Sequence, residues 1–197
     1  MPETLLAAPA PSLCLDFVNT RYWRGTPQPS DELGDAEALC GWLQRHGVTG
    51  RVSPRQFSAA LEARESLYGL LRALAVSTPA PPGAAAALAQ QVAAAPPRCA
   101  LVLAPPQSGW RVPARRSDVA ALLAPVWWSA ADLVLAADRL RLRCCANPRC
   151  GWLFLDDSKG GTRRWCSMSA CGNRAKVQRH ALRQRSLKAP VRPAGTR

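Results

Sequence analysis

The chain of 197 residues lacks any stretch of about 18 apolar residues, which is the length that a membrane-spanning helix needs. Its N-terminus carries Glu3 where a secretory signal would carry basic residues. The two histidines, His46 and His180, have no neighbouring residues in a ligand pattern. These absences argue against a membrane span, secretion and a histidine-based metal centre, and we expect a cytoplasmic protein.

Acidic residues are scarce toward the C-terminal end. Residues 1–138 contain 11 basic and 11 acidic residues, whereas residues 139–197 contain 15 basic residues and only Asp156 and Asp157. The whole formal charge of +13 therefore belongs to the last 59 residues. Such a segment suits a polyanionic partner such as nucleic acid, with a solvated basic tail as the alternative.

Cysteine is not scarce, and four of the eight cysteines form a pattern. The motif C-x4-C-G occurs twice, from Cys145 to Gly151 and from Cys166 to Gly172, and 15 residues separate the two pairs. Two thiol pairs at this spacing match a tetrahedral metal site, most often zinc. We therefore predict one structural Zn²⁺ held by Cys145, Cys150, Cys166 and Cys171. We also expect the glycine after each pair to adopt a positive φ.

The remaining cysteines do not fit the motif. Cys144 adjoins Cys145, but only Cys145 reproduces the x4 spacing, so we assign Cys145 as the ligand. Free cysteine commonly packs as a small hydrophobe. This is the expectation for three cysteines that are scattered among apolar neighbours, namely Cys14, Cys40 and Cys99.

Apolar periodicity predicts a mainly helical domain over residues 1–138. Ser53-Pro54-Arg55-Gln56 reads as a capping box with proline in the first turn. Pro125 should kink or split a helix capped by Ser117. The predicted helices cover residues 35–46, 53–76, 84–95 and 117–137.

The rest of this domain is expected to be less regular. The residues before the apolar run Leu13–Val18 read as a loose start. Two short β-prone runs, 99–103 and 110–112, predict a β-hairpin. Together these elements give a mainly α (α+β) fold class.

Residues 139–188 predict a small zinc-ribbon-like finger that ends in a basic helix. Alternating residues in 139–143 and 152–155 favour strands on either side of the first cysteine pair, and the segment 156–161 favours a turn. Because this ribbon is small, metal binding at roughly 10–16 kcal/mol should supply most of its stability. The final helix is expected from Ala170 to about Lys188, followed by a disordered tail at 189–197.

The basic residues of the finger are the candidate nucleic-acid contacts. Adding four thiolate charges and one Zn²⁺ to +13 still leaves this segment at +11. Lys176, Arg179 and Arg183 fall on one side of the predicted helix. Arg174 has an alternative role, which is to brace the zinc thiolates. The full candidate set is Arg163, Arg164, Arg174, Lys176, Arg179 and Arg183.

Residues 145–179 resemble the CGNR zinc finger, a family named for the tetrapeptide that stands here as Cys171-Gly172-Asn173-Arg174. Leu13–Asn19 resembles the start of the ABATE domain, which is commonly found ahead of that finger. The resemblance implies a stress-induced transcription regulator whose upstream domain holds a small ligand. The turn after Asp156 departs from the family, since Asp157 and Lys159-Gly160-Gly161 stand where relatives show other polar and basic residues.

Four functions follow from these patterns. The first is a transcription regulator that binds double-stranded DNA, and the second is an RNA-binding or protein-interaction finger using the same cations. In the third, a domain sensing a small molecule through Asp16, Asn19 and Arg21 changes how the fingers of a homodimer are presented. The alternative reading is that Asp16 and Asn19 satisfy backbone groups at a helix start. A zinc enzyme is disfavoured, because four cysteines leave no open coordination position.

Overall fold

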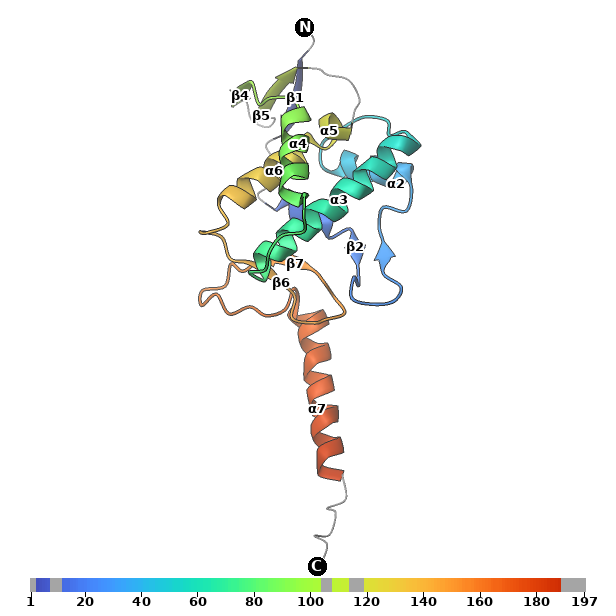
Figure 1. The fold of residues 1–197 in the computed structure, drawn as a ribbon, viewed down its shortest axis with the longest axis vertical. Helices are drawn as coiled ribbons and strands as arrows, with labels where there is room; N and C mark the ends of the chain where they lie inside the picture. The colour runs from blue at the N-terminus through green and yellow to red at the C-terminus, as the bar shows by residue number, and fades with distance from the viewer. Residues whose placement is uncertain (1–2, 8–11, 104–107, 114–118, 189–197) are drawn as a thin grey trace, which may run out of the picture.

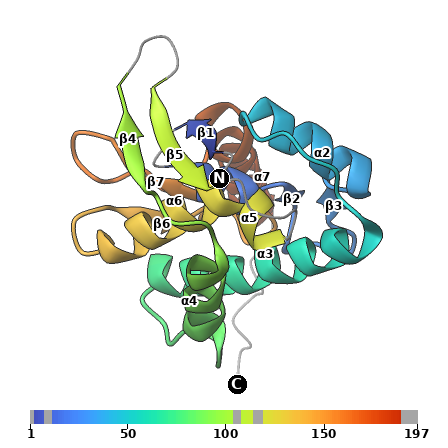
Figure 2. The same cartoon turned by 90° about the horizontal axis from the view of Figure 1, so that it is seen from above.

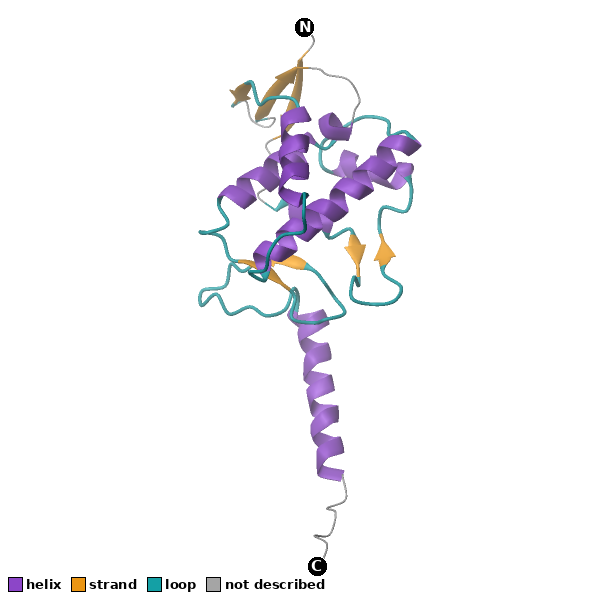
Figure 3. Cartoon of the chain, viewed as in Figure 1, coloured by secondary structure: helices purple, strands orange, loops and turns teal. Residues whose placement is uncertain are grey.

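The computed structural model describes residues 3–7, 12–103, 108–113 and 119–188. Helices predominate and the strands are short (Figure 3), which confirms the predicted class. The helical elements are α1 Leu13–Val18, α2 Ala36–Arg45, α3 Pro54–Ala75, α4 Ala84–Ala94, α5 Val119–Leu122, α6 Ala124–Leu135, the π-helical turn η1 Met168–Gly172 and α7 Asn173–Lys188. The strands are β1 Glu3–Ala7, β2 Arg21–Tyr22, β3 Ser30–Asp31, β4 Ala100–Val102, β5 Gly109–Pro113, β6 Leu142–Cys144 and β7 Leu153–Leu155.

Helix α3 is the longest element of the body and begins at the predicted capping box. The Ser53 side chain accepts a hydrogen bond from the Gln56 backbone, and the Gln56 side chain accepts one from the Ser53 backbone at 2.7 Å. Pro54 lies in the first turn, where its missing N–H leaves no partner unsatisfied. Seen from the end of the molecule, α3 runs between α2 and α4 (Figure 2).

The N-terminal segment is not loose, contrary to expectation. Residues Glu3–Ala7 form β1, which pairs antiparallel with β5, so that Leu5 lies opposite Arg111. The predicted hairpin is confirmed as β4 and β5, and the sheet order is β1-β5-β4. The strand β5 that pairs with β1 lies more than 100 residues later in the chain. This pairing could therefore not be inferred from the local sequence of β1.

Proline splits the last helical pattern of the body, as predicted. Helix α5 ends at Leu122, and α6 begins at Ala124 with Pro125 in its first turn, where proline is tolerated. The predicted cap at Ser117 lies outside the described residues.

The core is formed by helices of the body together with the finger's hairpin. Phe17 packs edge-on against Trp127, with ring centroids 6.2 Å apart. Leu142 of β6 and Leu153 of β7 are buried in the same cluster. The β6–β7 hairpin is therefore stabilised by packing on the body in addition to the metal, which the sequence pattern did not indicate.

The elements are arranged along one axis (Figure 1). The β1-β5-β4 sheet lies at one end, the β6–β7 hairpin lies below α3, and α7 extends away from the opposite end. Among the described residues, no helix is both long and apolar enough to cross a membrane.

Candidate metal centre and basic helix

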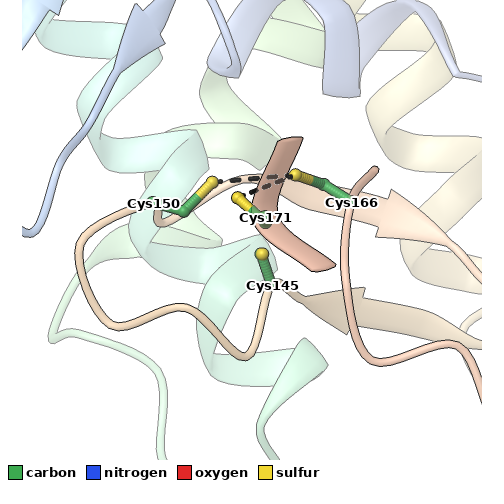
Figure 4. A group of neighbouring side chains, drawn as sticks. All are labelled: Cys145, Cys150, Cys166 and Cys171. Atoms are coloured by element: carbon green, nitrogen blue, oxygen red, sulfur yellow. Dashed lines mark hydrogen bonds between the residues drawn. The ribbon is translucent and has the colours of Figure 1, made fainter. Parts of the chain in front are cut away.

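The four predicted cysteines come together at the base of α7. Their sulfur atoms all lie within 4.8 Å of one another and point toward a common centre (Figure 4). The Sγ atoms of Cys150 and Cys166 are 3.7 Å apart, and those of Cys166 and Cys171 are 3.8 Å apart. Since Zn–S bonds of about 2.3 Å give a tetrahedron with edges of about 3.8 Å, the residues fit one zinc ion.

Cys144 lies outside this cluster, so the choice of Cys145 is confirmed. The Cys144 thiol is half-buried and lines the same surface pocket as the Arg72 side chain. Its burial raises its pKa, and Arg72 only partly offsets that effect.

Backbone and amide hydrogen bonds hold the two cysteine pairs in place. Asn147 donates its side-chain N–H to Cys171 Sγ at 3.5 Å and accepts from the Arg149 backbone at 3.1 Å. The Cys145 N–H donates to the Trp152 carbonyl oxygen at 2.8 Å. Such contacts orient the ligands and balance the charge of a thiolate centre.

The thiols of the cluster differ in pKa. The pKa of Cys150 is lowered to about 5, first because the Cys166 thiol donates a hydrogen bond to it, with the Trp152 backbone assisting. The pKa of Cys166 is raised, first by its hydrogen bond with Cys150 and next by burial. A bound metal ion would stabilise the thiolate form of all four cysteines.

The two glycines after the cysteine pairs differ. Gly151 adopts φ +71°, as predicted, and a Cβ there would lie 2.9 Å from the Tyr68 hydroxyl. Gly172 does not adopt a positive φ, and the prediction is wrong for it. It lies in η1, where a Cβ would meet the Met168 sulfur at 2.9 Å, and that flexible, exposed side chain could move aside.

Asp156 and Arg163 organise the turn between the cysteine pairs. The buried Asp156 carboxylate accepts hydrogen bonds from the Ser158 hydroxyl at 2.5 Å and from the Arg163 backbone at 3.1 Å. The hydrogen bond from Ser158 is the main cause of its lowered pKa. Arg163 donates to the carbonyl oxygens of Trp165 and Cys166. Arg163, a candidate nucleic-acid contact, therefore has an internal structural role.

A dense set of contacts joins the finger to the body. The Asn19 side chain donates to the Leu153 carbonyl oxygen at 2.8 Å and accepts from the Leu153 N–H at 3.0 Å. The Tyr68 hydroxyl donates to the Gly151 carbonyl oxygen at 2.8 Å. The Arg24 N–H donates to the Cys150 carbonyl oxygen at 3.3 Å. Orientation of the finger is thus fixed by buried polar contacts as well as by apolar packing.

The three residues predicted to bind a small molecule have different surroundings. Asn19 follows the end of α1, rather than a helix start, and its amide is occupied by Leu153. Arg21 lies 3.3 Å from the Glu65 carboxylate. Asp16 is exposed on α1. These positions explain Asn19 and Arg21 by internal contacts, and a sensing role for them stays a prediction.

Among the remaining basic candidates, those whose side chains the structure describes are exposed on the finger. Lys176 and Arg179 are exposed on α7, and Arg183 lies on the same helix. Arg164 is exposed, with its guanidinium 5.4 Å from the Trp165 ring centre. Arg174 lies 4.4 Å above the Trp23 ring.

Sequence reasoning missed the body residues that contact the finger. Arg24 forms an ion pair with Glu65 at 2.5 Å and stacks on Tyr68 at 3.8 Å. Burial would raise the pKa of Glu65, but the hydrogen bonds and charge of Arg24, with neighbouring arginines, lower it. The only local signal was the positive charge of Arg24 beside Trp23, which does not specify a partner.

Each of the two parts of the chain matches a known family model. Residues 12–137 match the ABATE family model, described as "Putative stress-induced transcription regulator". Residues 141–184 match the CGNR zinc finger model. No curated protein matches the chain significantly. Both matched families are regulatory or zinc finger domains and neither is enzymatic. Since the first model spans more than half of the sequence, the chain belongs to the ABATE family and carries a CGNR zinc finger with one structural zinc site.

Proposed function

We propose that this zinc finger protein is a transcription regulator that binds double-stranded DNA through α7. The observation that supports the proposal is the projection of α7 from the metal centre, away from the body (Figure 1). The helix has no acidic residue and six basic residues, which are Arg174, Lys176, Arg179, Arg183, Arg185 and Lys188.

The dimensions of α7 suit this role. Its 16 residues span about 24 Å, and the major groove of B-DNA, about 12 Å wide, accommodates an α-helix. The ligand Cys171 lies in η1, directly before α7, so the bound ion fixes the start of the helix. A closed set of four thiolates makes the zinc structural, and its contribution is to hold this geometry.

Phosphate contacts would supply most of the affinity. Lys176 and Arg179 are exposed, and no described carboxylate lies in an ion pair with them. Each neutralised phosphate releases a counterion, so binding should weaken steeply as salt rises. Sequence selectivity would need an arginine at a guanine edge in the major groove.

A charge-reversal experiment tests the proposal. Binding of a labelled mixed-sequence duplex is measured by fluorescence anisotropy for the wild type and for the double variant Lys176→Glu/Arg179→Glu. We expect the affinity to fall roughly 100-fold or more and the salt slope to become shallower by about two contacts. The matched control is Arg51→Glu/Arg55→Glu, which reverses two exposed charges on the body. The proposal is wrong if both double variants lose the same duplex affinity. It is also wrong if the wild type binds the duplex only weakly and Lys176→Glu/Arg179→Glu leaves that binding unchanged.

The same assay separates the alternative partner class. Structured RNA used as an unlabelled competitor should displace the duplex only at higher concentration. Stronger competition by RNA than by duplex DNA would favour the RNA-binding alternative.

A small-molecule effector and a homodimer stay predictions. Thermal-shift screening tests the effector, since a ligand at 100 times its dissociation constant adds about 2.7 kcal/mol.

A further inference from the structure

An open groove of about 630 Å³ lies between the loop that follows β2 and the start of α7. A second, apolar hollow of about 290 Å³ adjoins it, and Trp23 lines both. Tyr22 and Trp152 line the second hollow, with their ring centroids 5.6 Å apart. Three of the metal ligands, Cys150, Cys166 and Cys171, line it too, so this hollow is part of the metal centre. The residues lining the larger groove are Trp23, Thr26, Pro27, Gln28, Asn147, Arg149 and Arg174.

Trp23 is held in an unusual backbone conformation at the centre of this surface. Its φ is +56°, a left-handed value that is uncommon for a bulky residue. The turn is fixed because the Thr26 N–H and hydroxyl both donate to the Trp23 carbonyl oxygen, at 2.9 and 2.7 Å. Conformations of this kind persist where the surroundings determine them and cluster at binding sites. Here the turn sets the indole beside the metal centre.

The groove is positively charged and its cations are not neutralised. Arg149 and Arg174 are exposed, and no ion pair joins either one to a carboxylate within the described part of the chain. No acidic residue lines the groove. The buried or half-buried arginines of the body differ, since Arg24 pairs with Glu65 and Arg64 with Asp31. Arg174 stacks on the Trp23 ring, with its guanidinium carbon 4.4 Å from the ring centre. Two guanidinium groups without a carboxylate partner, one of them stacked on an indole, favour an anion that also carries a flat ring.

We propose that this groove binds a nucleotide, with its phosphate at Arg149 and its base on the stack formed by the Arg174 guanidinium and the Trp23 ring. The volume is in the range of nucleotide-sized sites, and stacking of a base on aromatic and guanidinium planes tolerates any base. The base must be unpaired, because a duplex buries the faces of its bases. Its source is either a free mononucleotide or an unpaired nucleotide in a single strand. The inference goes beyond duplex binding by α7 and does not depend on it.

The test uses the full zinc-loaded chain and two pairs of probes of matched phosphate charge. AMP is compared with ribose 5-phosphate, and an eight-nucleotide oligothymidylate is compared with an abasic strand of the same length. We expect at least one base-containing probe to bind roughly tenfold or more tightly than its partner without bases. Binding of AMP identifies the free nucleotide as a source, and binding of the strand alone identifies the single strand.

Two groove variants locate the binding without altering the metal ligands. Arg149→Gln removes one cation, and Gln28→Glu adds a negative charge at an exposed position in the groove. Each should weaken the bound probe about tenfold, with zinc content unchanged and duplex binding altered less than threefold. Arg51→Gln, outside the groove, is the charge-matched control for Arg149→Gln and should have little effect. The proposal is overturned if neither base-containing probe exceeds its control, or if both groove variants bind as Arg51→Gln does.

Discussion

The body and the finger are stabilised by different physical means. Body residues such as Phe17, Leu71 and Trp127 are almost completely buried in one apolar cluster, and the charges of residues 1–138 balance. The finger carries the whole net charge, and its own small cluster consists of three cysteines and Phe154. Apolar burial therefore stabilises the body, whereas a bound ion must hold the finger's loops and the start of α7.

The comparison shows why a strongly basic helix can be presented so far from a core. Helix α7 has no apolar stripe to bury, and its charges would repel one another in a loose chain. Fixing its first turn at Cys171 supplies orientation without a hydrophobic interface.

Removing one zinc ligand should unfold the finger and spare the body. In Cys171→Ser, zinc content should fall from one ion per chain to near zero, because three thiolates bind the ion far more weakly. Loss of most of the roughly 10–16 kcal/mol of binding energy should expose residues 145–188 to trypsin. Limited proteolysis with mass spectrometry measures this, and a fragment that keeps β1 and ends near Arg149 should persist. Full zinc content in the variant would show that Cys171 is not a ligand.

A cavity in the body should have the converse effect. Leu71 is fully buried in α3, and Leu71→Ala should lower the free energy of unfolding by about 2–5 kcal/mol. Denaturant titration measures this loss, while metal analysis should still find one zinc per chain. The exposed change Gln90→Ala is the control and should stay within about 0.5 kcal/mol of the wild type. Zinc loss in native Leu71→Ala would mean that the metal site depends on the body's packing.

The junction between the two parts can be weakened separately. Asn19→Ala leaves the Leu153 N–H and carbonyl oxygen without their side-chain partner at a buried position. We expect a loss of about 1–3 kcal/mol and a broader or two-step thermal transition. Calorimetry of the zinc-loaded protein detects this change. A single sharp transition at the wild-type temperature would show that the amide does not couple the parts.

Acid should affect the two parts at different pH values. Burial would raise the pKa of Asp31, but hydrogen bonds from Arg64 and the Leu33 backbone, with the Arg64 charge, lower it overall. This contribution is present above the unfolded pKa of about 3.9 and is lost as pH falls through the lower folded value. Zinc should leave at a higher pH, since its thiolates must protonate. Asp31→Asn should flatten the stability curve below about pH 4, and parallel stability curves for variant and wild type would contradict this.

Local patterns in the sequence predicted the metal site and most helices. The four cysteines lie in two short motifs, and the Ser53 capping box and Pro125 act within one helical turn, so their consequences can be read locally. Strand β1 could not be predicted, because β5 pairs with it from more than 100 residues away. Nor could the Asn19–Leu153 contact, which joins positions 134 residues apart. The left-handed conformation at Trp23 could not be predicted either, because the residue is neither glycine nor asparagine.

We propose that zinc holds α7 in an orientation that allows it to bind DNA. The most direct test measures duplex affinity for zinc-loaded, chelator-treated and zinc-reloaded protein at about 50 and 200 mM salt. Chelation should weaken binding at least tenfold and flatten its salt dependence, and zinc should restore both. Undiminished affinity and an unchanged salt slope in metal-free protein would contradict the claim, because the basic segment would then bind without the finger.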